Sequence, residues 1–400
     1  MLVMARVKYF GVVVSVGGGL LFALAACSGG DDDAAGSGGA SGAGAASAGG
    51  GTGGGAGSAG ASGGGGSGAV GGVSGSGGAG GAGTGGTGAG IVPPSWADCL
   101  ARSAATTTVI TGTQSLFKQK SPPADWNLDL TAALFDGYPD QTTSPVNVGS
   151  TTPAVRACIG GGIVKGQQAL DLTWLDMHDT IGGGGYRINT APGEWTRIDG
   201  IRVHNVEDAL KPRGQDGYWE LWNAYMTYIR DDCIENDETA PGSVHDSLFD
   251  GCYTGFSEQL QSGCCDAEPG EVFVVERSLM RLQPMPGPYG TPDPKVLGHG
   301  KFFKWVTPVP HPVVISDSIF LSEGMPSSTS TNWPFPPGTK TTNVTIVWDG
   351  PVPWTWPVPP GTTVTTDKSV WDKARQRWLD RHGCTSFDNC SKLTNPDPWP

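Results

Sequence analysis

The chain has 400 residues, of which 65 are glycine, 9 cysteine and 14 tryptophan, and its formal net charge is −13. No proline precedes Pro93 and no strict Gly-X-Y period runs through the chain, which excludes a collagen-like fibre. After residue 90, glycine, proline, threonine and valine interrupt the sequence every few residues, which argues against a large all-helical domain.

The first 27 residues predict an export signal. Arg6 and Lys8 precede an apolar run that ends at Leu24-Ala25-Ala26-Cys27. This pattern is typical of a secretory signal, and an uncleaved membrane helix is the alternative for a run of this length. The last four residues resemble a bacterial lipobox. This resemblance implies cleavage before Cys27, lipid attachment to its thiol, and a membrane-anchored lipoprotein of the outer membrane or cell surface.

Residues 28–90 form a linker that we predict to be disordered. They contain 32 glycines, and almost all the others are alanine, serine or threonine. Asp31, Asp32 and Asp33 are the only charged residues and no aromatic residue is present, so the segment has too little apolar surface to fold. A glycine-rich coil of this length spans roughly 44 Å, enough to hold the folded part away from a lipid surface.

Residues 91–400 are predicted to fold, and their net charge is −12. This acidic balance argues against nucleic acid as a partner, because nucleic-acid binding requires a basic surface. Eight cysteines follow Cys27, and an even number in an exported chain indicates disulfides, although spacing alone does not fix their pairing. We expect the chain to act as a monomer.

Two sets of short stretches repeat along the folded part. The first set aligns without gaps at steps of 29, 24 and 19 residues: His178–Ile181, Glu207–Leu210, Asp231–Ile234 and Asp250–Tyr253. The second set recurs at steps of 31 and 40 residues: Asp246–Phe249, Arg277–Met280 and Asp317–Phe320. Strand-like stretches at such a period, with loops of variable length and no helical period between them, predict a solenoid whose coils bury their apolar faces by stacking.

The fold class that follows is all-β, a parallel β-helix over residues 91–350. With these repeats the sequence resembles the right-handed parallel β-helix proteins of the pectate-lyase-like superfamily, over roughly residues 105–350. The first set places small residues in one inward column: Thr180, Ala209, Cys233 and Cys252. Adjacent coils stack about 4.8 Å apart, so Cys233 and Cys252 form either a disulfide or an unbonded ladder.

Acidic residues of the first set form the main candidate site. Asp179, Asp208 and Asp232 are predicted to share one column, and further acidic residues stand beside it: Glu207, Asp231 and Asp250. Stacked carboxylates repel one another, so some must face water, share a proton or bind a cation. Three arrangements are open, namely an acid–base pair acting on a glycosidic bond, a calcium site at Asp179, Asp208 and Asp232, or a solvated turn edge.

The stretch Asp231-Asp232-Cys233-Ile234 resembles the D-D-C motif of polygalacturonase-type glycoside hydrolases, which implies that Asp231 and Asp232 are catalytic. That family adds an N-T-D element one coil earlier and a G-H-G element about one coil later. No N-T-D element precedes Asp231 at that distance, and Gly298-His299-Gly300 lies two or three coils too far along the chain. The catalytic set of the family therefore does not transfer whole.

Lys211 and Arg213 are candidate catalytic cations for a lyase reaction, in which a base removes a proton next to a carboxylate. They follow Asp208 on the same predicted strand edge and are in register with Glu235 and Asp237 one coil later. Ordinary cross-coil salt bridges, Lys211 to Glu235 and Arg213 to Asp237, are the alternative.

Further residues are candidates for substrate binding: Trp219, Trp222, Glu235, His299 and Lys301. Aromatic faces stack on sugar rings, but tryptophan also packs in cores and loops, and the sequence favours neither. His178, His204 and His245 are isolated in the sequence, and we predict them to be surface or turn histidines.

Residues 351–400 are predicted to form a C-terminal cap rich in proline and tryptophan. Extended segments with Trp354 and Trp356 are expected to cover the last coil, because a solenoid needs its open ends covered. Residues 367–382 predict a short helix with one apolar face, and Cys384 and Cys390 are expected to close a short loop behind it.

Two functions are consistent with these features. The first is an exported, lipid-anchored enzyme that acts on a polysaccharide as a hydrolase or lyase, possibly with calcium as its cofactor. The second is a non-catalytic surface protein that binds glycan or another cell. The position of the carboxyl groups, exposed in one groove or not, distinguishes the two, because fold alone does not define function.

Overall fold

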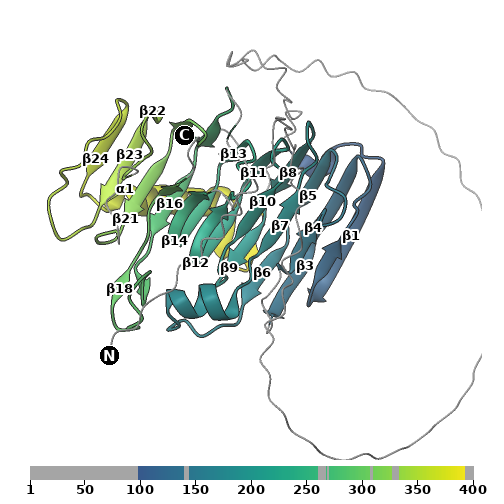
Figure 1. Cartoon of the computed structure of the whole chain (residues 1–400), viewed down its shortest axis with the longest axis horizontal. Helices are drawn as coiled ribbons and strands as arrows, with labels where there is room; N and C mark the ends of the chain where they lie inside the picture. The colour runs from purple at the N-terminus through teal and green to yellow at the C-terminus, as the bar shows by residue number, and fades with distance from the viewer. Residues whose placement is uncertain are drawn as a thin grey trace, which may run out of the picture. The chain divides into compact units, whose positions relative to one another are not determined.

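The computed structural model describes residues 98–138, 144–259, 267, 270–306, 310–326 and 333–391. The predicted export signal, the linker, Cys27, Cys264 and Cys265 lie outside these residues. The described chain is a right-handed parallel β-helix, in which a 22-stranded sheet winds around one axis (Figure 1). This confirms the predicted fold class. Within the described ranges, no helix is both long and apolar enough to cross a membrane.

The sheet has three faces, which we name A, B and C in the order that the chain visits them. Face A holds the first halves of β1 (Thr106–Gln114) and β3 (Trp126–Tyr138), then β5 (Ala157–Gly160), β8 (Trp195–Asp199), β11 (Tyr218–Trp222), β13 (Gly242–His245), β15 (Phe273–Glu276), β20 (Val313–Ser316) and β22 (Lys340–Thr342).

Face B begins with the second halves of β1 and β3. It continues with β6 (Ile163–Gly166), β9 (Arg202–His204), the first halves of β12 (Tyr225–Glu235) and β14 (Leu248–Glu258), β16 (Leu279–Leu282), β21 (Ile319–Ser322), β23 (Val344–Trp348) and β24 (Thr362–Thr365).

Face C holds β2 (Phe117–Gln119), β4 (Val146–Val148), β7 (Tyr186–Asn189), β10 (Leu210–Arg213), the second halves of β12 and β14, and β19 (Phe303–Trp305). Five elements lie outside these faces or form small antiparallel pairs: the 3-10 turn η1 (Cys99–Ala101), the π-helical turn η2 (Asp176–Ile181), the pair β17 (Met285–Pro286) and β18 (Leu297–Gly298), helix α1 (Ser369–Arg381), and the pair β25 (Cys384–Ser386) and β26 (Asn389–Cys390).

Inward side chains of successive coils stack on one another. On face A one such column is continuous through five coils, and each member is at most 1% exposed: Ile198, Leu221, Val244, Val275 and Ile315. Burying a side chain of this size contributes about 1.5–3 kcal/mol, so the stacked columns supply the main driving force for folding. The strands alternate because one face of each is buried.

The second predicted set of repeats is confirmed by the register. Leu248 pairs with Leu279, and Leu279 pairs with Ile319, across steps of 31 and 40 residues. Long loops therefore leave the coil between faces C and A without disturbing the pairing of the strands.

The first predicted set is correct at only one of its three steps. Leu210 pairs with Ile234 as expected, but its partner on the preceding coil is Tyr186 and not Ile181. Residues 178–181 belong to η2, so Asp179 and Thr180 are not members of the predicted columns. Asp250 pairs with Thr227 on face B, because a bulge between Ile229 and Asp232 shifts the register by one residue.

Three disulfides join described cysteines. Cys233 and Cys252 are bonded across adjacent coils inside the core, with their Cα atoms 5.9 Å apart. Cys384 and Cys390 close the loop after α1 as predicted, and Cys99 is bonded to Cys158, which fastens η1 to face A.

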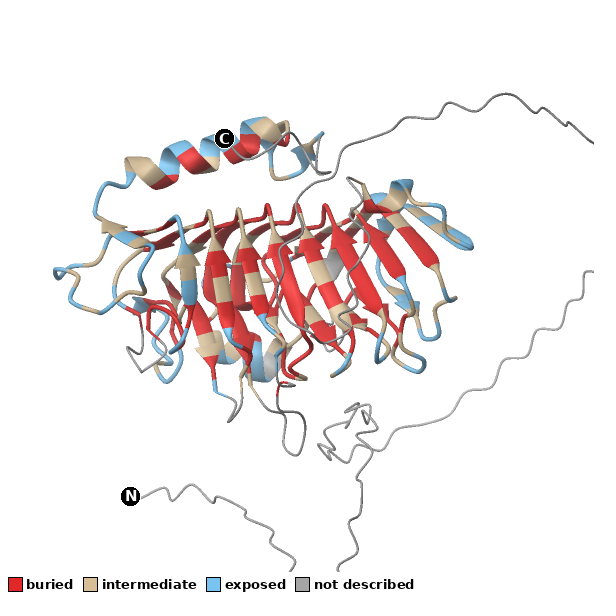
Figure 2. Cartoon of the chain, turned by 90° about the horizontal axis from the view of Figure 1, so that it is seen from above, coloured by how far each residue is buried: buried red, intermediate tan, exposed pale blue. Residues whose placement is uncertain are grey.

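Helix α1 confirms the predicted helix and runs along the outside of face B (Figure 2). Its buried residues Trp371 and Trp378 pack on outward apolar side chains of that face, such as Leu248 and Leu279. At the C-terminal end of the solenoid, Trp354 packs against Trp348 and the core, which confirms that the tryptophan-rich segment covers the last coil.

Candidate functional site

Four acidic residues meet at the corner between faces B and C, and we call this group the acidic corner: Glu207, Asp208, Asp231 and Asp232. Asp208 and Asp232 are 24 residues apart and lie on adjacent coils, where the Asp232 N–H donates to Asp208 Oδ1 at 2.9 Å. The bulge in β12 breaks the normal alternation of side chains along the strand. Asp231 and Asp232 can therefore face the same side, and each places an oxygen within 4.8 Å of one from Asp208.

Two lysines neutralise part of this charge. Lys211 Nζ lies 2.7 Å from Asp208 Oδ2 and 2.6 Å from Glu235 Oε2, which confirms the predicted cross-coil pair. Lys304 Nζ, on β19, lies 3.3 Å from Asp232 Oδ2. Among the described residues, neither Glu207 nor Asp231 forms an ion pair with a lysine or an arginine.

Residues from two loops cover the acidic corner, and we call them the roof: Trp174, His178 and Tyr289. The Trp174 indole donates to Asp231 Oδ1 at 2.8 Å, and its ring stacks on His178 at 4.3 Å between centroids. Tyr289 meets the Trp174 ring edge-on at 5.0 Å. The two loops are joined because the Trp174 N–H donates to the Gly287 carbonyl.

The roof leaves the acidic corner almost without solvent contact, and this burial shifts its acid–base chemistry. Asp232 is 1% exposed and Asp231 is 4% exposed. Burial and the neighbouring carboxylates raise the pKa of Glu207 to about 9 and that of Asp208 to about 6. Burial raises the pKa of Asp231 strongly and that of Asp232 as well, although Lys304 opposes the shift in both.

The cations and the outer carboxyl groups are shifted in the opposite sense or share a proton. Although burial acts against the charged form, the surrounding carboxylates raise the pKa of both Lys211 and Lys304, so both amines stay protonated. Burial opposes ionisation of Glu235, yet Lys211 lowers its pKa to about 2. Burial and the nearby Glu235 raise the pKa of Asp237 to about 8.

Two carboxyl groups of the acidic corner lack a normal partner among the described residues. Asp232 Oδ1 is buried without a hydrogen bond, although the Ser257 hydroxyl is near enough to lower the pKa of this group. The Glu207 side chain is 6% exposed and has no hydrogen bond or ion pair. Buried polar groups are normally satisfied, so each of these points to a missing proton, water or ligand.

The structure brings together most of the predicted catalytic residues. Asp208, Asp231, Asp232 and Lys211 form one contiguous group, and Glu235 belongs to it through Lys211. Lys301 lies on the same corner two coils later, where its carbonyl accepts from the Gly255 N–H. Burial and the nearby Lys304 lower the pKa of Lys301.

Several predicted site residues lie elsewhere. Arg213 pairs with Glu238 at 3.3 Å, one residue beyond the predicted partner Asp237. Asp179 is on η2, where its carboxylate is largely exposed and accepts from His178, so the predicted calcium column of Asp179, Asp208 and Asp232 is wrong.

His299 and Trp219 are core residues and not part of a binding surface. The ring of His299 is fully buried and lies 3.1 Å from the Ser322 hydroxyl. The Trp219 side chain points into the solenoid, where its indole donates to the Ala240 carbonyl at 3.1 Å. An alternation pattern places a tryptophan on a strand, but the register decides whether it faces inward.

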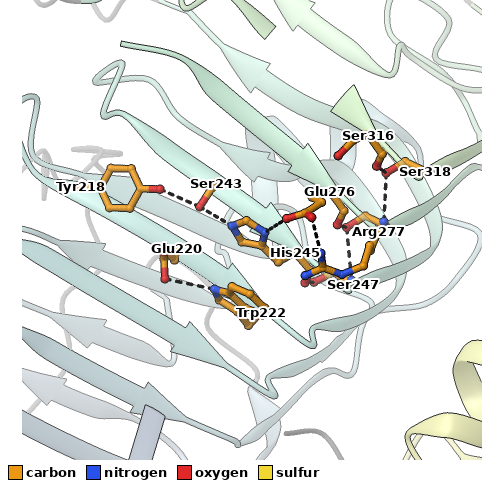
Figure 3. Close-up of polar contacts among 11 residues, drawn as sticks. Tyr218, Glu220, Trp222, Ser243, His245, Ser247, Glu276, Arg277, Ser316 and Ser318 are labelled. Carbon is orange, nitrogen blue, oxygen red and sulfur yellow. Dashed lines mark hydrogen bonds and ion pairs between the residues drawn. The ribbon is translucent and has the colours of Figure 1, made fainter. Parts of the chain in front are cut away.

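Trp222 lies on the outer side of face A, away from the acidic corner, beside His245 (Figure 3). Its ring stacks on His245 at 4.2 Å, and the Arg197 guanidinium lies 4.6 Å from its centroid. Neighbouring coils therefore occupy both faces of the ring, and Trp222 does not offer the free face that sugar stacking needs. His245 is itself held by Ser243 and Glu276 (Figure 3).

Sequence reasoning did not assign Trp174, His178, Glu207, Lys304 and Tyr289 to the site. One signal for Glu207 was present, because Glu207-Asp208 and Asp231-Asp232 are adjacent acidic pairs in register. The roof left no such signal, since its loops leave the solenoid from different coils and meet only in the folded chain.

No family model, curated protein or solved structure matches this chain. The function is therefore argued from the geometry of its own residues.

Proposed function

We propose that the protein acts on polysaccharide, with the acidic corner as a glycosidase-type acid–base centre. The observation that carries this proposal is the meeting of Asp208, Asp231 and Asp232, whose oxygens lie within 4.8 Å of one another. Glycoside hydrolysis uses two carboxyl groups, about 5–5.5 Å apart when one is the nucleophile. Three carboxyl groups on two adjacent coils supply such a pair.

The contacts of each carboxyl group favour different roles. Asp232 Oδ1 has no hydrogen bond among the described residues, so this group is free to exchange a proton with a substrate. Asp208 is bound by Lys211 and by the Asp232 N–H, which hold its carboxylate in place as the second group. We assign proton transfer to Asp232 and the nucleophile or base to Asp208.

The hydrolase reaction fits this corner better than the lyase reaction. A lyase needs a neutral amine or another base to remove a proton from the sugar. Lys211 and Lys304 are both held in the charged form by carboxylates, and Arg213 is paired with Glu238. Their charge instead suits binding of an acidic sugar.

A non-catalytic glycan-binding function is the alternative, and the burial of the site favours it. Asp232 is 1% exposed beneath the roof, whereas Tyr289 is 69% exposed and presents an aromatic surface. A glycan can bind at Tyr289 without reaching the carboxyl groups. Catalysis requires the substrate to displace Trp174 from Asp231.

The test uses the full chain with a panel of acidic and neutral polysaccharides. New reducing ends and the ultraviolet absorbance of unsaturated products are followed together. We expect reducing ends without absorbance, and a loss of kcat/KM of about 10²-fold or more in Asp232→Asn, because proton transfer by a side chain contributes 10²–10⁴-fold. Asp293→Asn, at an exposed carboxylate in another loop, is the control.

Three outcomes contradict the proposal. Unsaturated products would indicate a lyase, and full activity in Asp232→Asn would place the reaction elsewhere. Binding of glycan without turnover across the panel would support the alternative function.

We also infer that the protein is exported and anchored by a lipid at Cys27. The three disulfides support an oxidising compartment, since such bonds are rare in reducing cytosol. Metabolic labelling with a fatty acid should mark the wild-type chain and not Cys27→Ser. Equal labelling of both would contradict lipid attachment at this residue.

A further inference from the structure

Beside the acidic corner, a second group of side chains combines an imidazole with two carboxyl groups. His178, Glu207 and Asp231 each offer one ligand atom, and these atoms lie within 4.8 Å of one another. His178 comes from η2 in the roof, while Glu207 and Asp231 come from adjacent coils beneath it. We propose that this group binds a divalent transition-metal ion, with zinc as the best fit. Binding of the ion does not depend on the proposed glycan activity.

The carboxyl group of Glu207 is the first reason. Its side chain is more than nine-tenths buried, has no hydrogen bond or ion pair among the described residues, and reaches toward His178 and Asp231. The lysines of the acidic corner do not serve it, because Lys211 binds Asp208 and Glu235, and Lys304 binds Asp232. A buried carboxyl group with no partner among the described residues needs a cation or a proton.

The spacing of the ligand atoms is the second reason. His178 Nε2 lies 3.7 Å from Asp231 Oδ2, which is too long for a hydrogen bond. Zinc binds imidazole nitrogen and carboxylate oxygen at about 2.0–2.2 Å, so two such ligands of one tetrahedral ion lie about 3.4 Å apart. A closure of a few tenths of an ångström would therefore seat the ion.

Both Asp231 and His178 are oriented by their other polar atoms. His178 Nδ1 is 2.8 Å from Asp179 Oδ1, which directs the Nε2 lone pair toward Asp231. Asp231 Oδ1 accepts from the Trp174 indole, which leaves Oδ2 facing His178. A histidine whose second nitrogen donates to a carboxylate is the usual arrangement of a metal ligand. Asp179 is thus assigned a positioning role and not the ligand role that the sequence suggested.

The ligand types decide the class of ion. Calcium takes oxygen ligands, usually six to eight of them, whereas imidazole suits zinc and its transition-metal neighbours. The His178 side chain is 42% exposed, so an ion can enter from solvent at this point. Once bound, it would join the roof to the coils beneath.

The experiment uses the full chain after chelation and dialysis. Accessible thiols are first blocked with iodoacetamide, because free cysteines also bind zinc. Zinc chloride, manganese chloride and calcium chloride are titrated separately by calorimetry, and bound metal is counted by mass spectrometry. We expect one zinc ion per chain, tighter binding of zinc than of calcium, and visible absorption bands after cobalt substitution.

Variants locate the site. His178→Gln and Glu207→Gln should each lower zinc affinity by more than about 100-fold, and Asp179→Asn by about 10-fold, as expected for ligands and for an outer partner. His245→Gln and Glu220→Gln are matched controls on face A and should change affinity by less than about 2-fold. Unfolding curves measured in chelator show that each variant is folded.

The proposal is overturned by no zinc binding at millimolar concentration, by tighter binding of calcium than of zinc, or by unchanged affinity in folded His178→Gln. Zinc binding without polysaccharide turnover would leave this site standing and reject only the proposed enzyme function. Turnover without zinc binding would do the reverse.

Discussion

The acidic corner differs from the corner between faces A and B, where serines from three coils form what we call the serine corner: Ser247, Ser278 and Ser318. Each hydroxyl accepts a backbone N–H from the preceding coil and donates to a carbonyl of its own coil. A hydroxyl can do both, so the ladder is complete without a ligand. Ionised carboxylates only accept, so a stack of them needs cations or protons from outside the ladder. The serine corner is built for stability, and the acidic corner holds uncompensated charge where chemistry can occur.

The largest expected effect lies beside the serine corner, where α1 covers face B. Trp378 is 1% exposed, and its indole donates to the Asp246 carbonyl at 3.0 Å. Trp378→Ala should lower the free energy of unfolding by about 3–5 kcal/mol, as for other large buried aromatic residues. Chemical denaturation measures this change, with Arg377→Ala on the exposed side of α1 as the control. A change below about 1 kcal/mol would mean that α1 is not part of the cooperative fold.

The second effect concerns a buried charge pair that, unlike the acidic corner, is balanced. His311 is 1% exposed and contacts Glu258 and Glu271, and although burial acts against the charged ring, both carboxylates raise its pKa to about 9. A raised pKa means that the pair stabilises the fold fully below the unfolded value of about 6.5, and that this stability is lost as the pH rises through about 9. The loss amounts to at most about 3 kcal/mol.

The measurement compares the free energy of unfolding of the wild type and of His311→Gln between pH 6 and pH 10. The difference between the two should shrink as the pH rises. His245→Gln is the control, and a constant difference across the range would show that His311 is neutral in the fold.

The third effect tests the serine corner directly. Ser278→Ala leaves the buried Ser247 N–H without its acceptor and should cost about 1–3 kcal/mol. Ser121→Ala, at an exposed hydroxyl, should stay within about 0.5 kcal/mol. Equal effects of both substitutions in thermal and chemical unfolding would show that the serine ladder does not stabilise the corner.

The smallest effect should have the opposite sign and comes from the acidic corner. In chelator, Asp231→Asn removes one of several crowded carboxyl groups while its amide oxygen still accepts from Trp174. We expect a gain between zero and about 1 kcal/mol in the free energy of unfolding. With zinc present, the same substitution should lose the stabilisation that the ion gives to the wild type. A loss above about 1 kcal/mol in chelator would make this corner structural, like the serine corner.

The repeats alone determined the architecture. Short apolar alternations at solenoid spacing permit few folds, because each coil buries its apolar side only against its neighbours. The step from Leu210 to Ile234 and the serine-containing repeats were readable because no bulge intervenes there. Helix α1 and its following disulfide were readable because both depend on local spacing.

The contents of the site were decided only by the tertiary structure. Asp208, Asp231, Asp232 and Lys211 were predicted from their register, but a one-residue bulge decided that Asp231 and Asp232 face the same side. Trp219 and His299 were misplaced because the face of a strand depends on its pairing and not on its residue types. His178, Trp174 and Tyr289 reach the corner through loops whose sequence carries no period. Local patterns specify which segments stack, whereas the path of irregular loops, and so the roof over the carboxyl groups, follows from packing between residues far apart in the chain.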